Sequence, residues 1–342
     1  MAQTSLIATV YNDREGTELF LARMEEQTRR PDEIIVCDAG STDGTWELLR
    51  RYEASGAIPL VALQERKCRP ARGRNLAASM AQHATLTVTD IGCGWEPQWL
   101  EELVAPFDSI ADLEAVMGSW KVRWEDQQTH WAKADYALQN GLELRATPRS
   151  HAANRAIAYR KDFYFRLGGL PEDLSFAADD MTFALLIQNL GTAIAAAPEP
   201  RCYWLRPQSL GQLLREARRN FRGNGEAGIG LKHFVLVGGR LIAELLGALI
   251  VPIGLALHLP VAILIAAAVL PAGSIFLRAL RWREIVRRFG ERGCAVSPVH
   301  LAVLDYLSRW YGLRGYMQGM VHGFRHCMTC RVRLRSAKIS WA

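Results

Sequence analysis

Residues 5–90 alternate between short apolar runs and longer stretches in which apolar residues recur at helical spacing. The apolar runs are short enough for strands, and the stretches between them are long enough for helices. Strands that alternate with helices predict a parallel, right-handed, doubly wound α/β sheet. The expected strands are 5–10, 33–38, 58–63 and 84–89, and the expected helices are 17–27, 42–54 and 74–82.

Polar residues stand where three of these strands end: Tyr11, Asp38 and Asp90. Ligands of open α/β sheets bind outside the carboxyl ends of the strands, so the three side chains are expected to share one rim. Asp38 opens the segment D-A-G-S-T-D-G-T, which favours a ligand-binding loop. The same residue types also form plain turns that cap a following helix, and this loop alone barely separates the two interpretations.

Several short motifs follow one another along the chain. They are Thr9-Val10-Tyr11-Asn12, the stretch 27–36 that leads into the Asp38 loop, Arg74-Asn75-x-Ala77, Thr89–Cys93, and Gly168–Glu172 followed by Asp179-Asp180. In this order they resemble the inverting glycosyltransferases of family 2, which have the GT-A fold, over residues 4–230. The order carries the resemblance, since each motif alone is short.

The resemblance implies roles for residues on the donor side. Thr9, Tyr11 and Asp38 would grip the base and ribose of a nucleotide sugar. One of Arg69, Arg72 and Arg74 would touch the diphosphate, because they cluster just before a helix whose N-terminus also attracts phosphate. The alternatives are a packed aromatic at Tyr11 and a solvated basic loop for the arginines.

Asp90 lies where the family carries its D-x-D motif, and the resemblance implies that it faces the ribose and a divalent cation. Mg²⁺ and Mn²⁺ prefer such oxygen ligands. The chain departs from the pattern because Gly92 replaces the second acid. Two alternatives for neutralising the diphosphate remain open. One is a cation held by Asp90, the diphosphate and water, and the other is neutralisation by arginines.

Asp179-Asp180 matches the acidic pair on the acceptor side of the family, and the second acid, Asp180, would be the general base. Two adjacent carboxylates raise each other's proton affinity, which suits a base that works near neutral pH. The alternative is that Asp180 caps the helix expected over 181–190. His151 lies on the same side of the domain. Arg218, Arg219 and Arg222 form either a phosphate clamp or a basic patch facing lipid.

Leu241–Leu277 contains no Lys or Arg and a single carboxylate, Glu244. A bilayer crossing takes about 20 apolar residues, so this run, extended back to about residue 234, predicts a hairpin of two crossings. Basic residues on both flanks predict cytoplasmic ends. Arg240 can pair with Glu244 at i, i+4. The alternative is a buried helical hairpin of a soluble protein.

The last 65 residues, 278–342, carry 13 Lys or Arg against 3 Asp or Glu. Because they follow the hairpin, membrane lipid is the expected partner and nucleic acid is not. The alternative is that their helices pack on the catalytic domain. Seven scattered cysteines and no visible signal peptide indicate a reduced compartment and a cytoplasmic catalytic domain at the inner membrane. Cys327 and Cys330 form a possible but incomplete metal motif.

These inferences predict a GT-A domain over 1–230, a transmembrane hairpin over 231–280 and a basic interfacial region over 281–342. The expected activity is transfer of a sugar from a nucleotide diphosphate to a lipid-linked glycan acceptor in envelope or extracellular polysaccharide synthesis. Two alternatives are a synthase that places the sugar on a polyprenyl phosphate and a non-catalytic subunit that binds nucleotide sugar.

Overall fold

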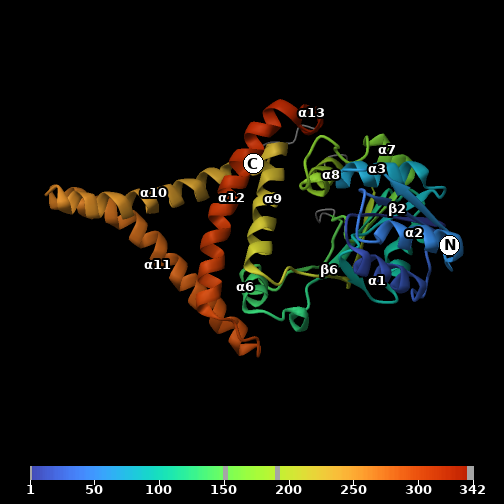
Figure 1. The fold of residues 1–342 in the computed structure, drawn as a ribbon, viewed down its shortest axis with the longest axis horizontal. Coiled ribbons are helices and arrows are strands. Elements are labelled where there is room, and N and C mark those ends of the chain that lie inside the picture. The colour runs from blue at the N-terminus through green and yellow to red at the C-terminus, as the bar shows by residue number, and fades with distance from the viewer. Residues whose placement is uncertain (1, 149–152, 189–192, 337–342) are drawn as a thin grey trace. The chain divides into compact units, whose positions relative to one another are not determined.

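The computed structural model describes residues 2–148, 153–188 and 193–336. The chain forms two compact units (Figure 1). The first, here called the sheet unit, comprises Met1–Arg123, Leu142–Arg206 and Phe324–Ser340. The second, the helical unit, comprises Trp124–Gly141 and Pro207–Gly323. This division cuts across the domain limits expected at residues 230 and 280, which stay a prediction.

One mixed sheet organises the sheet unit, with strand order β3-β2-β1-β4-β8-β6-β9-β5 and β7 paired with β6. The first four strands are parallel, as expected from the alternation along residues 5–90. β8 runs antiparallel to both β4 and β6, and β9 is parallel to β6, so the second half of the sheet is mixed. The strands are β1 Thr4–Val10, β2 Glu33–Asp38, β3 Leu60–Gln64, β4 Thr85–Val88, β5 Cys93–Trp95, β6 Ala115–Lys121, β7 Glu143–Leu144, β8 Ile157–Arg160 and β9 Ile194–Trp204.

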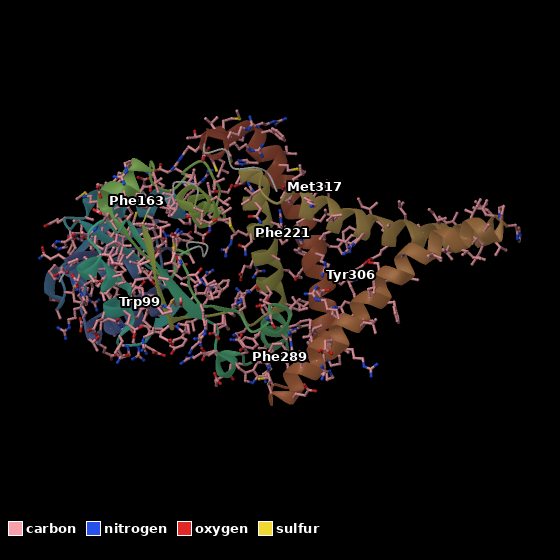
Figure 2. All side chains as sticks on the ribbon, turned by 180° about the vertical axis from the view of Figure 1, so that it is seen from behind. Trp99, Phe163, Phe221, Phe289, Tyr306 and Met317 are labelled. Carbon is pink, nitrogen blue, oxygen red and sulfur yellow. The ribbon has the colours of Figure 1, made fainter. Side chains whose placement is uncertain are left out.

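Helices cover this sheet and close its hydrophobic core, in which Trp95 packs edge to face against Phe20 and tilted against Trp99. Figure 2 shows Trp99 within the dense side chains of this unit. The helices are α1 Arg14–Glu25, α2 Thr45–Ser55, α3 Pro70–Met80, α4 Trp99–Val104, α5 Pro106–Ser109, α7 Lys161–Arg166, α8 Asp179–Gln188 and α13 Met328–Ser336.

Helix α3 lies unusually close to β1, because a Cβ on Gly73 would approach Thr9 Cγ2 to 2.8 Å. A real side chain does not tolerate that distance, so glycine lets the helix sit against the end of the strand. This approach brings the arginines of α3 to the carboxyl ends of the parallel strands. Pro70 occupies the first turn of α3, where its missing N–H costs nothing.

The last described helix, α13, belongs to the sheet unit although it follows the helical unit in sequence. Cys330 N donates to Asp173 Oδ2 at 2.9 Å, and Arg333 donates to Gly169 O at 2.7 Å. The part of the basic tail over 328–336 therefore packs on the loop before α8, which is the alternative to an interfacial helix there. The thiol of Cys327 also contacts Asp173, donating to its carbonyl oxygen at 3.0 Å, so the C-x-x-C motif binds this loop through one thiol and one backbone N–H.

The helical unit is built around α9 and α12, which cross at glycines. A Cβ on Gly315 or Gly319 would overlap the carbonyl oxygens of Arg218 and Arg222 on α9. Phe221 packs directly over Gly312, since a Cβ there would lie 3.0 Å from the Phe221 ring. The core at the other end of the unit surrounds Phe289. The elements of the unit are the 3₁₀ turn Trp124–Asp126, α6 His130–Leu138, α9 Leu210–Ala227, α10 Leu231–Ala256, α11 Val261–Glu291 and α12 Pro298–His326.

Helices α10 and α11 form the expected hairpin, and each is long and apolar enough to cross a membrane. Figure 1 shows them as two long helices that meet at one end. Glu244, the carboxylate in the apolar run, is buried and pairs with Arg278 of α11, while Ser274 donates to it at 2.6 Å. The expected partner, Arg240, is exposed instead. The i, i+4 prediction was wrong because Glu244 faces α11.

Candidate functional site

Asp38 ends β2 with its side chain fully buried. Its carboxylate accepts hydrogen bonds from Ser41 N at 3.1 Å, from Ser41 Oγ at 2.5 Å and from Gln64 Nε2 at 2.7 Å. Gln64 is the residue beside Asp38 in the register of β2 and β3. Three donors therefore hold this carboxylate in one orientation at the rim of the sheet.

The loop after β1 is tied to the loop after β2. Asn12 N donates to Ser41 Oγ at 2.8 Å, and Thr42 N donates to Asn12 Oδ1 at 2.8 Å. Asn12 adopts φ +50°, a conformation that asparagine tolerates better than most residues. Beside it, Tyr11 is 62% exposed. An exposed ring on a braced loop suits contact with a ligand better than the packed alternative.

Arg74 joins two segments that are distant in sequence. Its Nη2 lies 2.5 Å from Asp90 Oδ1, and its Nη1 lies 3.0 Å from Asp179 Oδ2. Asn154 also donates to Asp179, at 3.2 Å. The arginine side chain is 8% exposed and that of Asp179 is 10% exposed, so this is a buried bridge. It brings the end of β4 and the start of α8 into one site.

The neighbouring Asn75 fixes the loop that precedes α8. Its Oδ1 accepts from Leu170 N at 2.9 Å and from Tyr164 Oη at 2.6 Å, and its amide donates to Leu170 O at 2.9 Å. Gly169 adopts φ +64° against this side chain. Asn75, of the motif Arg74-Asn75, therefore holds the segment Gly168–Glu172 in place, so the two motifs meet in the folded chain.

Asp180 lies in the first turn of α8 and is half-buried. Burial raises the pKa of its carboxyl to about 6, and the charge of Asp179 adds to the rise. The positive charge of Arg155 lowers the pKa of Asp180, and the negative charge of Asp90 raises it by a smaller amount. All these groups therefore act on one carboxyl. The helix begins at Asp179, so Asp180 is not the residue before the helix that would cap it.

Comparisons with known proteins bear on the family and the fold of the chain. The family model for glycosyl transferase family 2 matches residues 5–167, which run from β1 to the loop before α8. Glycosyltransferase AglE of Haloferax volcanii is 23% identical over 222 residues, covering 64% of this chain and 72% of that protein. Residues 5–167 of the chain therefore form a glycosyltransferase family 2 domain.

Other relatives of this glycosyltransferase are named for lipid-linked or polysaccharide substrates. WbaN of Salmonella anatum, an O-antigen chain rhamnosyltransferase, is 24% identical over 58% of this chain and 65% of that protein. WfaP of Escherichia coli, named a UDP-Glc:α-D-GlcNAc-diphosphoundecaprenol β-1,3-glucosyltransferase, is 28% identical, but the match covers 28% of this chain and 37% of WfaP.

A solved structure shows the same fold. The mannosyltransferase PcManGT of Pyrobaculum calidifontis, in complex with GDP-Man and Mn²⁺, aligns over 95% of this chain and 87% of that protein, with a TM-score of 0.53 and 21% sequence identity. The sheet unit of the glycosyltransferase thus has the GT-A architecture that the resemblance predicted.

The chain offers a divalent cation a single carboxylate at the D-x-D position. Asp90 is 36% exposed, so it can reach a cation although Arg74 binds one of its oxygens. Gly92 adds no ligand, and a Cβ there would meet nothing within 4 Å. These residues fit a cation that takes its other ligands from diphosphate and water, as Mg²⁺ commonly does.

The remaining predicted arginines, except Arg219, have protein partners. Arg69 donates to Asp173 O at 3.4 Å and Leu174 O at 3.3 Å, so it braces the loop before α8. Arg218 and Arg222 lie on α9 of the helical unit, where they donate to Gln318 at 3.0 Å and Glu226 at 2.8 Å, and Arg219 is exposed. Their phosphate role stays a prediction. His151 lies outside the described residues.

Several site residues escaped the sequence analysis. Gln64 binds Asp38, Asn154 binds Asp179, and Arg155 acts on Asp180. Gln64 ends the third strand, so the rule that polar residues at strand ends face the ligand rim would have found it. Asn154 and Arg155 precede a strand in the mixed half of the sheet. The alternation of strands and helices that predicted the parallel half was not visible in this part of the sequence.

Proposed function

We propose that this glycosyltransferase moves a sugar from a nucleoside diphosphate to a hydroxyl group of a lipid-linked glycan, with inversion at the anomeric carbon. The observation that carries the proposal is the Arg74 bridge, which joins the end of β4 on the donor side to Asp179 on the acceptor side. Its neighbour Asp180 has its pKa raised to about 6, close to the value that a base near neutral pH requires.

The reaction is a single displacement. The acceptor oxygen forms a bond to the anomeric carbon as its proton passes to Asp180. The bond from that carbon to the phosphate oxygen breaks on the opposite side, and its electron pair leaves with the nucleoside diphosphate. Attack from the opposite face inverts the anomeric configuration. Asp38 and Tyr11 hold the nucleoside at the rim while Asp90 faces the ribose.

Negative charge develops on the departing diphosphate and must be neutralised. A divalent cation held by Asp90, diphosphate oxygens and water would supply charge stabilisation when bound. The fixed guanidinium of Arg74 holds the carboxylate of Asp90 in one orientation for this task. Arg72 lies on the exposed side of α3 and pairs with two surface carboxylates, Glu65 and Glu172. Surface pairs are weak, so a phosphate can displace these carboxylates from Arg72.

The acceptor is lipid-linked because the chain carries its own membrane hairpin. We infer that α10 and α11 cross the inner membrane and that both ends of the hairpin are cytoplasmic, as the flanking basic residues indicate. Relatives named for undecaprenyl-diphosphate and O-antigen substrates support an acceptor of this class. A role in envelope or extracellular polysaccharide assembly follows from it.

The donor is identified by a thermal-shift screen of nucleotide sugars on the detergent-solubilised chain, with and without Mn²⁺, because a ligand that binds only the folded state raises its stability. The donor found is then used with lipid-linked and soluble acceptors. We expect Asp180→Asn to bind the donor normally and to lose turnover by about a hundredfold or more. Efficient turnover by Asp180→Asn, or on soluble acceptors alone, would reject the proposal. A glycosidic product also excludes a polyprenyl-phosphate sugar synthase.

A further inference from the structure

Arg155 lies against two tryptophan rings of the sheet unit. Its guanidinium carbon is 3.6 Å from the ring centre of Trp204 on β9 and 4.8 Å from that of Trp120 on β6. The two rings meet edge to face, with centres 5.6 Å apart. Guanidinium groups bind aromatic faces through the ring quadrupole, so the rings hold the charge in place without using its N–H donors.

The backbone places Arg155 beside the reacting groups. Its carbonyl oxygen accepts from Thr89 Oγ1 at 2.8 Å, and Thr89 directly precedes Asp90. The residue before it, Asn154, donates to Asp179 at 3.2 Å. Arg155 therefore directly follows a residue that donates a hydrogen bond to Asp179, and its positive charge lowers the pKa of Asp180. It stands on the acceptor side of the site.

Two N–H donors in this cluster are buried without a hydrogen-bond acceptor among the described residues: Nε of Arg155 and Nε1 of Trp120. Buried donors are nearly always bonded, and an unbonded one costs about 1–3 kcal/mol. A charged donor and a neutral donor in one aromatic cluster, in which the guanidinium carbon is 4.8 Å from the Trp120 ring centre, suit an anion on a molecule with an apolar part. Arginine favours phosphate in this setting.

We propose that Arg155 and Trp120 bind the phosphate of an acceptor whose sugar is joined to its lipid through a diphosphate. The inference rests on the proposed function and names the feature of the acceptor that this site would recognise. A phosphate held here would bring the sugar beside it within reach of the base, so the site would favour acceptors with the diphosphate close to the reacting hydroxyl.

The test is direct binding of geranyl diphosphate to the full chain in detergent by isothermal titration calorimetry, with geraniol as the neutral control. We expect geranyl diphosphate to bind and geraniol not to bind. Arg155→Gln should weaken geranyl diphosphate about tenfold or more, because it removes a charge-assisted hydrogen bond. Trp120→Phe keeps a ring and removes the N–H, so a smaller loss, about threefold, is expected.

Arg160→Gln is the matched control. Arg160 ends β8 and also lies over an aromatic ring, that of Phe107 at 4.8 Å, but its guanidinium donates to backbone carbonyls. It should leave geranyl diphosphate binding unchanged. Thermal unfolding of each variant checks the fold, and if Arg155→Gln does not fold, Arg155→Lys and Trp120→Phe carry the test.

Three results would overturn the inference. The first is that geranyl diphosphate fails to bind the wild-type chain, and the second is that it binds Arg155→Gln as tightly as wild type. Equal losses of UDP or GDP affinity in Arg155→Gln would place Arg155 on the donor diphosphate instead. Because the experiment measures binding and not turnover, its result can still be interpreted if the proposed transfer reaction is not found.

Discussion

Arg74 donates to Asp90 across 2.5 Å, so the carboxylate at the D-x-D position of this glycosyltransferase has a resident positive charge. The same guanidinium holds Asp179, and its side chain is 8% exposed. One arginine thus connects Asp90, after β4, with Asp179, at the start of α8, which the proposed function assigns to the donor and acceptor sides. It couples the stability of the fold to the geometry of the reacting groups.

Replacing Arg74 should therefore lower the stability of the fold and disturb the geometry of the site. Arg74→Met leaves the buried Asp179 without its charged partner, and we expect a loss of about 3 kcal/mol in the free energy of unfolding. Urea unfolding of the solubilised chain measures it. Arg72→Met is the control on the same helix, since Arg72 is 42% exposed and its surface pairs contribute about 1 kcal/mol at most. Equal effects of the two substitutions would contradict the buried bridge.

Activity should depend on pH through Asp180. Burial and the neighbouring Asp179 raise the pKa of this carboxyl to about 6, and only its ionised form accepts the proton. We expect kcat/KM to be constant above that pH and to fall about tenfold per pH unit below it. Arg155 lowers the pKa of Asp180, so Arg155→Gln should move the fall to higher pH. A flat profile between pH 5 and 7.5 would remove Asp180 from the role of base.

Restoring the second acid should strengthen metal binding. Gly92→Asp has room, since a Cβ there meets nothing within 4 Å, and it would add a second carboxylate to Asp90. We expect Mn²⁺ affinity in the presence of nucleoside diphosphate to rise about tenfold, measured by the loss of the free Mn²⁺ signal in electron paramagnetic resonance. The double variant Asp90→Asn, Gly92→Asp should lose the gain. Unchanged affinity would show that position 92 does not face the cation.

The hairpin of α10 and α11 should depend on its internal ion pair. Glu244→Ala leaves Arg278, which is 12% exposed, without its partner, and we expect a loss of about 3 kcal/mol in stability. Thermal unfolding in detergent micelles measures the change. Arg240→Ala, one turn away and exposed, is the control and should have little effect. If the control is as harmful as Glu244→Ala, the sequence-based pairing with Arg240 was right after all.

The sequence by itself predicted the parallel half of the sheet. Residues 5–90 repeat one local unit, and buried parallel strands are recognisable as apolar runs. The polar ends of these strands followed from the same pattern, so Asp38 and Asp90 were correctly placed at strand ends. The two long apolar helices were also visible, because length and composition alone identify them.

Tertiary structure alone decided which residues meet. The strand order β8-β6-β9, the partner of Glu244 and the bridge from Arg74 to Asp179 all join segments that lie far apart in the chain. Periodicity reports whether a residue is buried but not what it is buried against. Ion pairs are visible only in the folded chain, and so are donors such as Arg155 Nε that find no acceptor among the described residues.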